Sequence, residues 1–457
     1  MKEKLREVVE KNQNKIAYIV GDKSITYKEL WDKANIYGDL LKREGNSPVI
    51  LYGQKEIEMV IAILACIISG RAYVPLGLCT PLFRIKKIIE MTKSSIMITG
   101  EKINIEGINV SNLEGLHKYA NNEINDNDND IIYIIFTSGS TGEPKGVPIS
   151  KKNLSNFVNW ISKIKPLCDY KSISVLNTAS FSFDLSVADF YYSLCNGHTL
   201  VAFNDDVNDQ YDILFDLFKN IDVAVMTPTF MKLLLINNYF TEENYPRFKC
   251  VYFCGEQLEI KTVEKVFKAF PNICIINAYG PTEATSAVSG IQITKEMLNY
   301  DLIPVGEINN FATDIKIVNN EIVLKGDSVF NGYLNIKENI KEYHTGDIGF
   351  IKDGLLYCKG RKDNQVKYKG YRIELNDIEH NISMIKGVEE CAVIVKYDNE
   401  IVKTIKAFVV GKVDNKYVKE ELSKMLPSYM IPKSIVIIDK LPVNQNGKID
   451  RKALCNI

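Results

Sequence analysis

The stretch "IIFTSGSTGEPKGVPIS", residues 134–150, decides how this chain is interpreted. It begins with apolar residues that favour a β-strand and then changes to hydroxyl side chains, glycines and one lysine. Glycines that follow a strand let several backbone N–H groups converge on an anion, while hydroxyls add donors and Lys145 adds a positive charge. The stretch therefore predicts a phosphate-binding loop rather than a polar surface loop. Its candidate phosphate ligands are Thr137, Ser138, Gly139, Ser140, Thr141, Gly142 and Lys145.

This loop differs from the common nucleotide and hydrolase motifs. A Walker A motif needs Gly-Lys-Ser/Thr, but Pro144 precedes Lys145 here and Gly146 follows it. The spacing of the glycines does not fit GxGxxG, and the GxSxG nucleophile elbow is absent. The loop is thus a phosphate loop of another kind.

Composition limits the class of protein. The chain has 457 residues, 46% of them hydrophobic, which is enough for two or three domains. Its net charge of −1 gives no indication of a nucleic-acid or anionic-membrane partner.

The ten cysteines form no CxxC pair, so we expect nearly all of them to be reduced core residues in a reducing cytoplasm. The charged N-terminus does not resemble a signal peptide, and the apolar run 59–70 is too short to span a bilayer. We therefore expect a soluble, cytoplasmic protein without membrane insertion.

Alternating strand and helix patterns predict an α/β fold with mostly parallel sheets. The expected buried strands are 47–53, 131–136, 172–177, 223–228, 250–255 and 273–280. After about residue 300 the pattern changes to short β-runs, such as 314–326 and 354–360, which predict a β-rich subdomain. A highly charged stretch then precedes a new α+β pattern. We place the domains at 1–360 and 361–457.

Four further motifs follow the loop in a fixed order. They are "NAYGPTEAT" (277–285), "YHTGDIG" (343–349), "GRKDNQVKYKGYRIEL" (360–375) and "NQNGKIDRKAL" (444–454). Together with "FTSGSTGEPKGV" the set resembles the AMP-forming adenylating enzymes, which include acyl-CoA synthetases, luciferases and nonribosomal peptide synthetase adenylation domains. The resemblance covers essentially the whole chain. It implies a large N-terminal AMP-binding domain and a small, mobile C-terminal lid.

The resemblance also implies a reaction and its cofactors, ATP and Mg²⁺. A substrate carboxylate attacks the α-phosphate of ATP and pyrophosphate leaves, so cations and N–H dipoles must offset the repulsion between anions. The loop would hold the β- and γ-phosphates, Glu283 would ligate Mg²⁺, Thr282 would reach the α-phosphate, and Lys448 would stabilise the transition state. Asp363 matches the hinge of the lid. The implied nucleotide contacts are Asn277, Ala278, Tyr279, Gly280 and Pro281 for adenine, and Asp347 and Arg361 for ribose.

Substrate selectivity is expected from the stretch 177–200. Asp184 follows an aromatic-rich segment, where an acid is costly unless it meets a cation. In amino-acid-activating members the matching aspartate pairs with the α-ammonium group of the substrate. The alternative is that Asp184 simply caps the following helix.

The motifs "FSFDLSVADFY", "VYFCGEQL" and "YGPTEAT" resemble D-alanine–carrier protein ligases, which act in teichoic acid D-alanylation. That resemblance implies that Cys254, Ser286 and Lys448 contact the substrate, with Cys254 favouring the D-enantiomer. Ser286 stands where we expect a small apolar residue. The sequence has no phosphopantetheine attachment motif, so the implied carrier protein acts in trans.

Three other interpretations stay open from sequence. A stand-alone peptide-synthetase adenylation enzyme for another amino acid fits Asp184 equally well and is favoured by Ser286. An acyl-CoA synthetase is disfavoured by Asp184. A nucleotide sensor without catalysis is disfavoured because Lys448, Glu283 and Asp347 are all present.

Overall fold

The computed structural model describes residues 1–121, 129–139, 142–203, 211–308, 313–336, 340–363, 365–368, 371–398, 401–442 and 449–455. The chain divides into two compact units, which we call unit 1 and unit 2. Unit 1 comprises Met1–Gly77, Thr92–Ile135 and Val147–Gly360, and unit 2 comprises Leu78–Met91, Phe136–Gly146 and Arg361–Ile457. The domain limits inferred from sequence assigned the two earlier segments of unit 2 to the N-terminal domain. Those limits stay a prediction.

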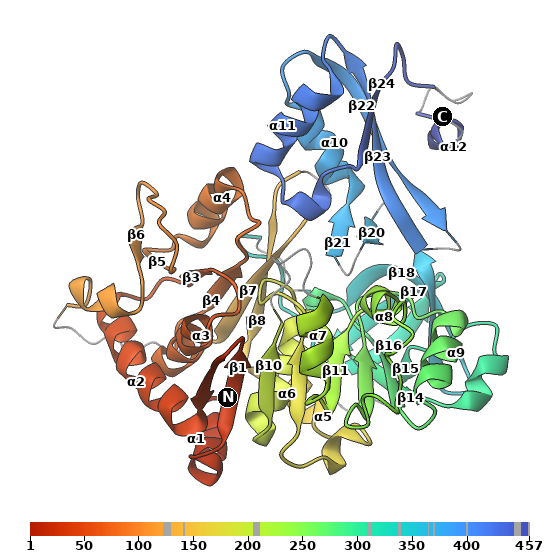
Figure 1. Ribbon diagram of the computed structural model, residues 1–457. Coiled ribbons are helices and arrows are strands. Elements are labelled where there is room, and N and C mark those ends of the chain that lie inside the picture. Colours follow the sequence, from red (N-terminus) through yellow and green to blue (C-terminus); the bar gives the residue numbers. More distant parts are fainter. Residues whose placement is uncertain are drawn as a thin grey trace. The chain divides into compact units, whose positions relative to one another are not determined.

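The largest sheet of unit 1 has eight strands in the order β14-β13-β12-β11-β9-β10-β1-β2. Figure 1 labels β1, β10, β11 and β14 of this sheet. Its central strands run parallel, and the outermost strand on each side is antiparallel to its neighbour. The predicted apolar strands are confirmed here, since β11, β12 and β13 are buried along their whole length. The strands are β1 (Ile16–Val20), β2 (Lys23–Thr26), β9 (Ser174–Asn177), β10 (Thr199–Ala202), β11 (Val223–Met226), β12 (Cys250–Phe253), β13 (Cys274–Tyr279) and β14 (Ser289–Ile293).

A second sheet has six strands in the order β6-β5-β3-β4-β7-β8. The first five of these strands are parallel. The two strands at its end, β7 and β8, flank the glycine-rich loop on either side. The strands are β3 (Val49–Tyr52), β4 (Tyr73–Leu76), β5 (Ile96–Ile98), β6 (Asn109–Ser111), β7 (Ile131–Thr137) and β8 (Lys145–Ser150).

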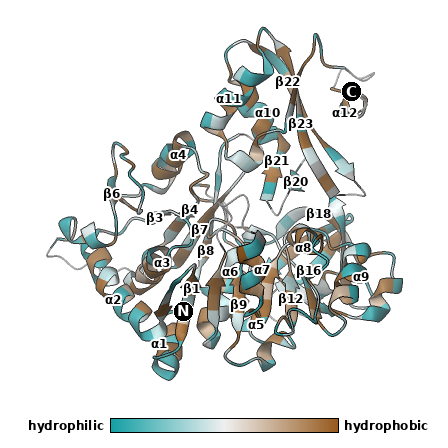
Figure 2. Ribbon diagram, viewed as in Figure 1, coloured by the Kyte–Doolittle hydropathy of each residue, from teal (hydrophilic) through white to brown (hydrophobic). Residues whose placement is uncertain are grey.

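The helices of unit 1 show clear local signals. The apolar run 59–70 forms α3, which is buried on all sides from Met59 onward and ends at Gly70 in the left-handed conformation. Thr26 begins α2 with a capping box, because its side chain accepts from the N–H of Glu29 and the Glu29 carboxylate accepts in return. In Figure 2 the outer helices α1, α2 and α9 carry both hydrophilic and hydrophobic faces.

Unit 1 contains α-helices and short 3-10 helices. The α-helices of unit 1 are α1 (Lys2–Asn12), α2 (Tyr27–Glu44), α3 (Ile57–Ser69), α5 (Lys151–Ile161), α6 (Leu185–Asn196), α7 (Tyr211–Phe218), α8 (Pro228–Leu234) and α9 (Ile260–Ala269). Short 3-10 helices are η1 (Glu114–Lys118), η2 (Leu167–Asp169), η3 (Thr282–Ala284), η4 (Lys295–Asn299) and, in unit 2, η5 (Ser428–Met430). Because η3 is a single turn, tertiary contacts must hold it in place.

The predicted β-rich region is confirmed as a five-stranded sheet in the order β15-β19-β18-β17-β16. Neighbouring strands pair antiparallel where the register is defined, and the hairpin β16–β17 turns at Asn319 and Asn320, both with positive φ. The strands are β15 (Gly306–Glu307), β16 (Thr313–Val318), β17 (Glu321–Gly326), β18 (Tyr343–Lys352) and β19 (Leu355–Arg361).

Unit 2 has its own core around the hairpin β20–β21, helix α10 and the sheet β22-β23-β24. Helix α4 joins this unit through a buried ion pair, in which Arg84 Nη1 lies 3.4 Å from Asp377 Oδ2. Nearby, the rings of Tyr371 and Tyr429 stack with centroids 4.0 Å apart. The elements are α4 (Leu82–Thr92), β20 (Gln365–Tyr368), β21 (Tyr371–Glu374), α10 (Leu375–Ser383), β22 (Val388–Asp398), β23 (Ile401–Gly411), α11 (Asn415–Met425), β24 (Ser434–Ile437) and α12 (Arg451–Leu454).

The cysteine prediction is only partly right. All ten cysteines are free thiols, but five are buried, three are partly exposed and two, Cys79 and Cys455, are exposed. Composition alone does not reveal which thiols are buried, because burial depends on the place of each residue in the fold. Within the described segments, no helix is long and apolar enough to cross a membrane.

Candidate active site

The motif 277–285 forms a buried turn at the end of β13, and we name it the 277–285 turn. Asn277 and Ala278 belong to the strand, and the Asn277 amide donates to the Pro304 carbonyl oxygen at 2.8 Å. Gly280 is required sterically, because a Cβ there would lie 2.5 Å from the Cα of Ala287. The chain can therefore pass through this point only as glycine, and Pro281 then leads into η3.

Asp184 lies beside this turn. It stands at the N-cap position of α6, yet its side chain makes no capping hydrogen bond. Instead Asp184 Oδ2 accepts from Thr282 Oγ1 at 2.7 Å, across 98 residues of sequence. The alternative, in which Asp184 only caps the helix, is therefore not supported, because the capping hydrogen bond is absent. The structure brings together the residue predicted to select the substrate and the residue predicted to reach the α-phosphate.

Glu283 is fully buried, with 0% of its surface exposed. Its carboxylate Oε1 accepts from Tyr333 Oη at 2.8 Å, and its backbone oxygen accepts from the N–H of Phe330 at 2.8 Å. A buried carboxylate needs such partners, because desolvation penalises the charge. The segment around Tyr333 therefore fixes the only acidic side chain in the 277–285 turn.

Asp347, on β18, is held by hydrogen bonds in a similar way. Tyr279 Oη donates to Asp347 Oδ2 at 2.6 Å, and the Thr345 hydroxyl accepts from the Asp347 N–H at 3.0 Å. Burial raises the pKa of Tyr279, and the Asp347 charge raises it further. The phenol thus stays protonated and remains a donor to the carboxylate.

The motif around Asp347 has a further acidic partner. Glu321 Oε1 accepts from the Gly346 N–H at 2.8 Å, and Glu321 Oε2 lies 3.1 Å from His344 Nδ1. This carboxylate holds the turn that places Asp347. It lies on β17, outside every motif that the sequence singled out.

Cys254 and Ser286 also lie together. Cys254 Sγ is 3.8 Å from the backbone oxygen of Ser286, and both residues are buried. Ser286 is only 2% exposed and has a φ of 70°, a strained conformation for a serine. Within the described part of the chain its hydroxyl has no hydrogen-bond partner. A buried hydroxyl without a partner costs free energy, so this position calls for a ligand or water that can pair with it.

The glycine-rich loop belongs to unit 2. The N–H of Gly142 donates to the Gly139 carbonyl oxygen at 3.1 Å and closes a turn. A Cβ at Gly139 would lie 2.1 Å from the Glu143 oxygen, and one at Gly142 would overlap the ring of His380. Close packing therefore requires glycine at both positions, and the φ of 80° at Gly142 favours glycine there as well.

The other residues of the loop differ in their place in the fold and in their contacts. Thr137 ends β7, and Lys145 begins β8 with its side chain partly buried. The Ser138 hydroxyl donates to the Arg372 carbonyl oxygen and accepts from the Glu374 N–H, both at 3.0 Å, so it links the loop to β21. Ser140 and Thr141 lie outside the described residues.

The predicted hinge and lid residues are only partly described. Arg361 forms a two-pronged ion pair with Asp363, with N–O distances of 2.7 and 2.6 Å. Burial alone would raise the pKa of Asp363, but its bonds to Arg361 outweigh that effect and the pKa lies below its ordinary value. Lys448 lies outside the described residues, so its proposed role rests on sequence.

The carboxylate at this site could hold Mg²⁺ only together with oxygen ligands from a bound nucleotide. Glu283 offers the hard carboxylate oxygen that Mg²⁺ prefers. Among the described residues, however, no group of three or more His, Cys, Asp or Glu side chains could hold a metal ion. Phosphate oxygens of a bound nucleotide would have to complete the coordination, as is common for Mg²⁺.

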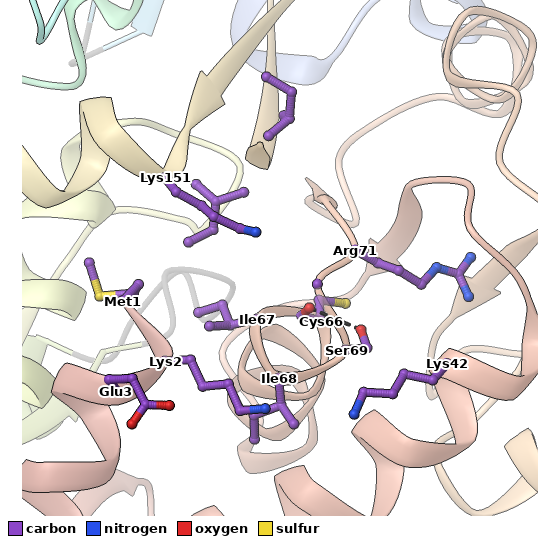
Figure 3. A pocket seen from close by; sticks show the side chains of 13 residues that line it. Met1, Lys2, Glu3, Lys42, Cys66, Ile67, Ile68, Ser69, Arg71 and Lys151 are labelled. Carbon is purple, nitrogen blue, oxygen red and sulfur yellow. Dashed lines mark hydrogen bonds between the residues drawn. The ribbon is translucent and has the colours of Figure 1, made fainter. Parts of the chain in front are cut away.

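A separate cavity of about 310 Å³ lies at the C-terminal end of α3 (Figure 3). Lys2, Lys42 and Lys151 line it, together with Arg71, which is paired with Glu44. None of the predicted site residues lines this cavity.

Sequence reasoning missed Tyr333 and Glu321. Tyr333 contacts Glu283 across 50 residues, and Glu321 contacts Gly346 across 25. Neither residue lies in a motif, and a lone tyrosine or glutamate in a β-rich region carries no local signal. Only the tertiary fold reveals them.

Known proteins similar to this chain identify its family. The sequence profile of the AMP-binding enzyme family matches residues 5–334, and that of the AMP-binding enzyme C-terminal domain matches residues 377–448. The D-alanine–D-alanyl carrier protein ligase of Listeria innocua is 38% identical over 94% of this chain and 93% of its own length. The protein of the same name from Lactococcus lactis is 35% identical over 99% and 98%.

Solved structures agree in fold. An o-succinylbenzoate CoA synthetase from Bacillus subtilis superposes with a TM-score of 0.85 at 21% identity, covering 99% of this chain and 98% of that chain. An adenylation domain from Vibrio cholerae in complex with glycyl-adenosine-5'-phosphate also gives 0.85, at 23% identity, covering 99% and 96%. The profile match alone extends over more than half of the sequence. The chain therefore belongs to the AMP-binding enzyme family.

Proposed function

We propose that this chain is an ATP-dependent amino-acid ligase that charges the phosphopantetheine thiol of a separate carrier protein, with D-alanine as the substrate. The observation that carries this proposal is Asp184, held beside η3 by Thr282 at 2.7 Å. A carboxylate at this place pairs with an α-ammonium group and has no partner in a fatty or aryl acid. Relatives named D-alanine–D-alanyl carrier protein ligase match over nearly the whole chain and support the choice of amino acid.

The first half-reaction joins the amino acid to AMP. An oxygen of the amino-acid carboxylate attacks the α-phosphorus of ATP, and pyrophosphate leaves. In our proposal the loop residues from Thr137 to Lys145 hold the β- and γ-phosphates, Thr282 contacts the α-phosphate, and Lys448 offsets the charge that develops on the α-phosphate oxygens. Glu283 would help to hold Mg²⁺, which would supply positive charge to offset the phosphates.

Two further groups of residues hold the nucleotide in this proposal. Asp347 accepts hydrogen bonds from the ribose hydroxyls, assisted by Arg361. The ring of Tyr279 packs against adenine, and the backbone at Asn277, Ala278, Gly280 and Pro281 borders it. The hydrogen bond from Tyr279 to Asp347 would then couple the adenine and ribose contacts.

The second half-reaction transfers the amino acid to the carrier. The carrier thiol attacks the carbonyl carbon of the adenylate, a thioester forms, and AMP leaves. Asp363 serves as the hinge about which the C-terminal lid turns between the two half-reactions. Replacing Asp363 with proline should spare adenylation and impair thioester formation.

A carrier-charging assay tests the proposed function. Radiolabelled D-alanine, ATP, Mg²⁺ and a phosphopantetheinylated carrier protein are incubated with the enzyme, and label bound to the carrier is counted. The proposal predicts enzyme-dependent label that hydroxylamine releases, as a thioester requires. Free D-alanyl adenylate without any transfer to several carriers would contradict the ligase assignment.

Ser286 favours a second candidate, an adenylation enzyme for an amino acid with a polar side chain. Its buried hydroxyl lacks a partner in the described structure, and a substrate hydroxyl could supply one. A serine would then be preferred to alanine. Comparing D-serine with D-alanine in the charging assay separates the two candidates.

A further inference from the structure

The segment 328–333, which we call the strap, is tied to the 277–285 turn at three points. Thr285 Oγ1 donates to the Ser328 oxygen at 2.9 Å, and the Phe330 N–H donates to the Glu283 oxygen at 2.8 Å. The third tie is the hydrogen bond from Tyr333 Oη to Glu283 Oε1. The strap therefore reaches both the backbone and the side chain of Glu283.

The strap is itself anchored. The Asn153 amide in the first turn of α5 donates to the Asp327 and Val329 carbonyl oxygens at 2.8 and 3.0 Å. The Phe330 ring packs edge-on against Tyr333 at 4.9 Å and against Tyr343 at 5.6 Å. These contacts hold the Tyr333 ring in place, so its hydroxyl points toward the Glu283 carboxylate in a fixed direction.

We propose that Tyr333 is a positioning residue for adenylation, which acts by holding the carboxylate of Glu283 in the orientation that binds a divalent cation. This inference rests on the proposed function, because Glu283 is there the protein's metal ligand. A hydrogen bond to Oε1 restricts the rotation of the carboxylate group and so favours one orientation of it. Losing a partner that orients a metal ligand commonly costs about 10- to 100-fold in metal affinity or activity.

The decisive variant is Tyr333→Phe, which removes one oxygen atom and keeps the ring that packs on Phe330. The concentration of Mg²⁺ for half-maximal pyrophosphate exchange should rise by about 10-fold or more, with the KM for the amino acid nearly unchanged. A binding measurement gives a readout besides activity. Electron paramagnetic resonance of Mn²⁺ in the ATP complex should show weaker cation binding by a similar factor.

A matched control and a double variant sharpen the test. Tyr357→Phe removes a hydroxyl from the neighbouring sheet, where the ring stacks on Phe350 at 4.7 Å, and should leave metal dependence unchanged. If Tyr333 acts through Glu283, then adding Tyr333→Phe to Glu283→Gln should cause almost no further loss of cation binding. Fully additive losses would overturn the proposal.

The outcomes also separate this inference from the proposed function. Lower thermal stability of Tyr333→Phe with unchanged Mn²⁺ affinity would show a purely structural role and refute the inference. Absence of exchange with every amino acid in the unmodified protein would refute the proposed function instead. The Mn²⁺–ATP binding measurement needs no amino acid, so it still decides the role of Tyr333 in that case.

Discussion

Replacing Asp184 with asparagine isolates the charge that is proposed to bind the amino acid. The amide has the same size as the carboxylate, and its oxygen can still accept the hydrogen bond that Thr282 donates at 2.7 Å. The turn and α6 should therefore keep their positions. What disappears is the negative charge opposite the substrate ammonium group.

The size of the loss follows from the surroundings of Asp184. Breaking a buried, hydrogen-bonded charge pair costs about 2–5 kcal/mol, whereas an exposed pair contributes about 1 kcal/mol or less. Asp184 is partly buried, so we take about 2–3 kcal/mol. That corresponds to a decrease of roughly 30- to 140-fold in kcat/KM for the amino acid.

The assay is amino-acid-dependent exchange between ATP and pyrophosphate, with the substrates varied in turn. Asp184→Asn should raise the KM for D-alanine or lower kcat/KM by the stated factor, while the KM for ATP changes by less than about twofold. Thermal melting serves as the control for folding. Unchanged kcat/KM for the amino acid, or an equal loss for ATP, would refute the pairing.

Two further perturbations test other contacts. Tyr279→Phe keeps the ring but removes the 2.6 Å hydrogen bond to Asp347. A charge-assisted bond of about 1.5–3 kcal/mol predicts a decrease of roughly 10- to 140-fold in kcat/KM for ATP. An unchanged value would show that this bond does not position Asp347 for nucleotide binding. In unit 2, burial raises the pKa of Asp377 from 3.8 to about 6 despite the charge of Arg84, so its ionised form costs stability. The stability that this carboxyl contributes is therefore highest below about pH 4 and falls as the pH rises to 6. Hydrogen exchange of the α10 amides, corrected for intrinsic rates, measures this effect. Protection should fall with rising pH in the unmodified protein and should depend less on pH in Asp377→Asn. Equal pH profiles in the two proteins would contradict the raised pKa.

Much of the fold could be predicted because its signals are local. The apolar run of α3, the Thr26 cap and the buried strands β11 to β13 each lie within one short stretch. Hydrophobic periodicity and capping depend on neighbours in sequence, so they survive without tertiary information. The glycine-rich loop was found for the same reason.

The contacts at the candidate site could not be predicted in this way. Asp184 and Thr282 are far apart in sequence and meet only because β9, α6 and β13 belong to one sheet and its covering helix. Tyr333 and Glu321 carry no motif at all. Motifs indicated candidate residues, and tertiary packing determines which partner each of the described candidates has.

The most direct test of the account is substrate-dependent ATP–pyrophosphate exchange across D-alanine, L-alanine, D-serine, β-alanine, the other L-amino acids, and several aryl and fatty acids. We expect Mg²⁺-dependent exchange with D-alanine well above that with L-alanine, and none with acids that lack an α-ammonium group. Preference for D-serine would keep the chemistry and change the substrate to the one that Ser286 favours. Exchange with fatty or aryl acids alone would contradict the central claim that Asp184 selects an amino acid.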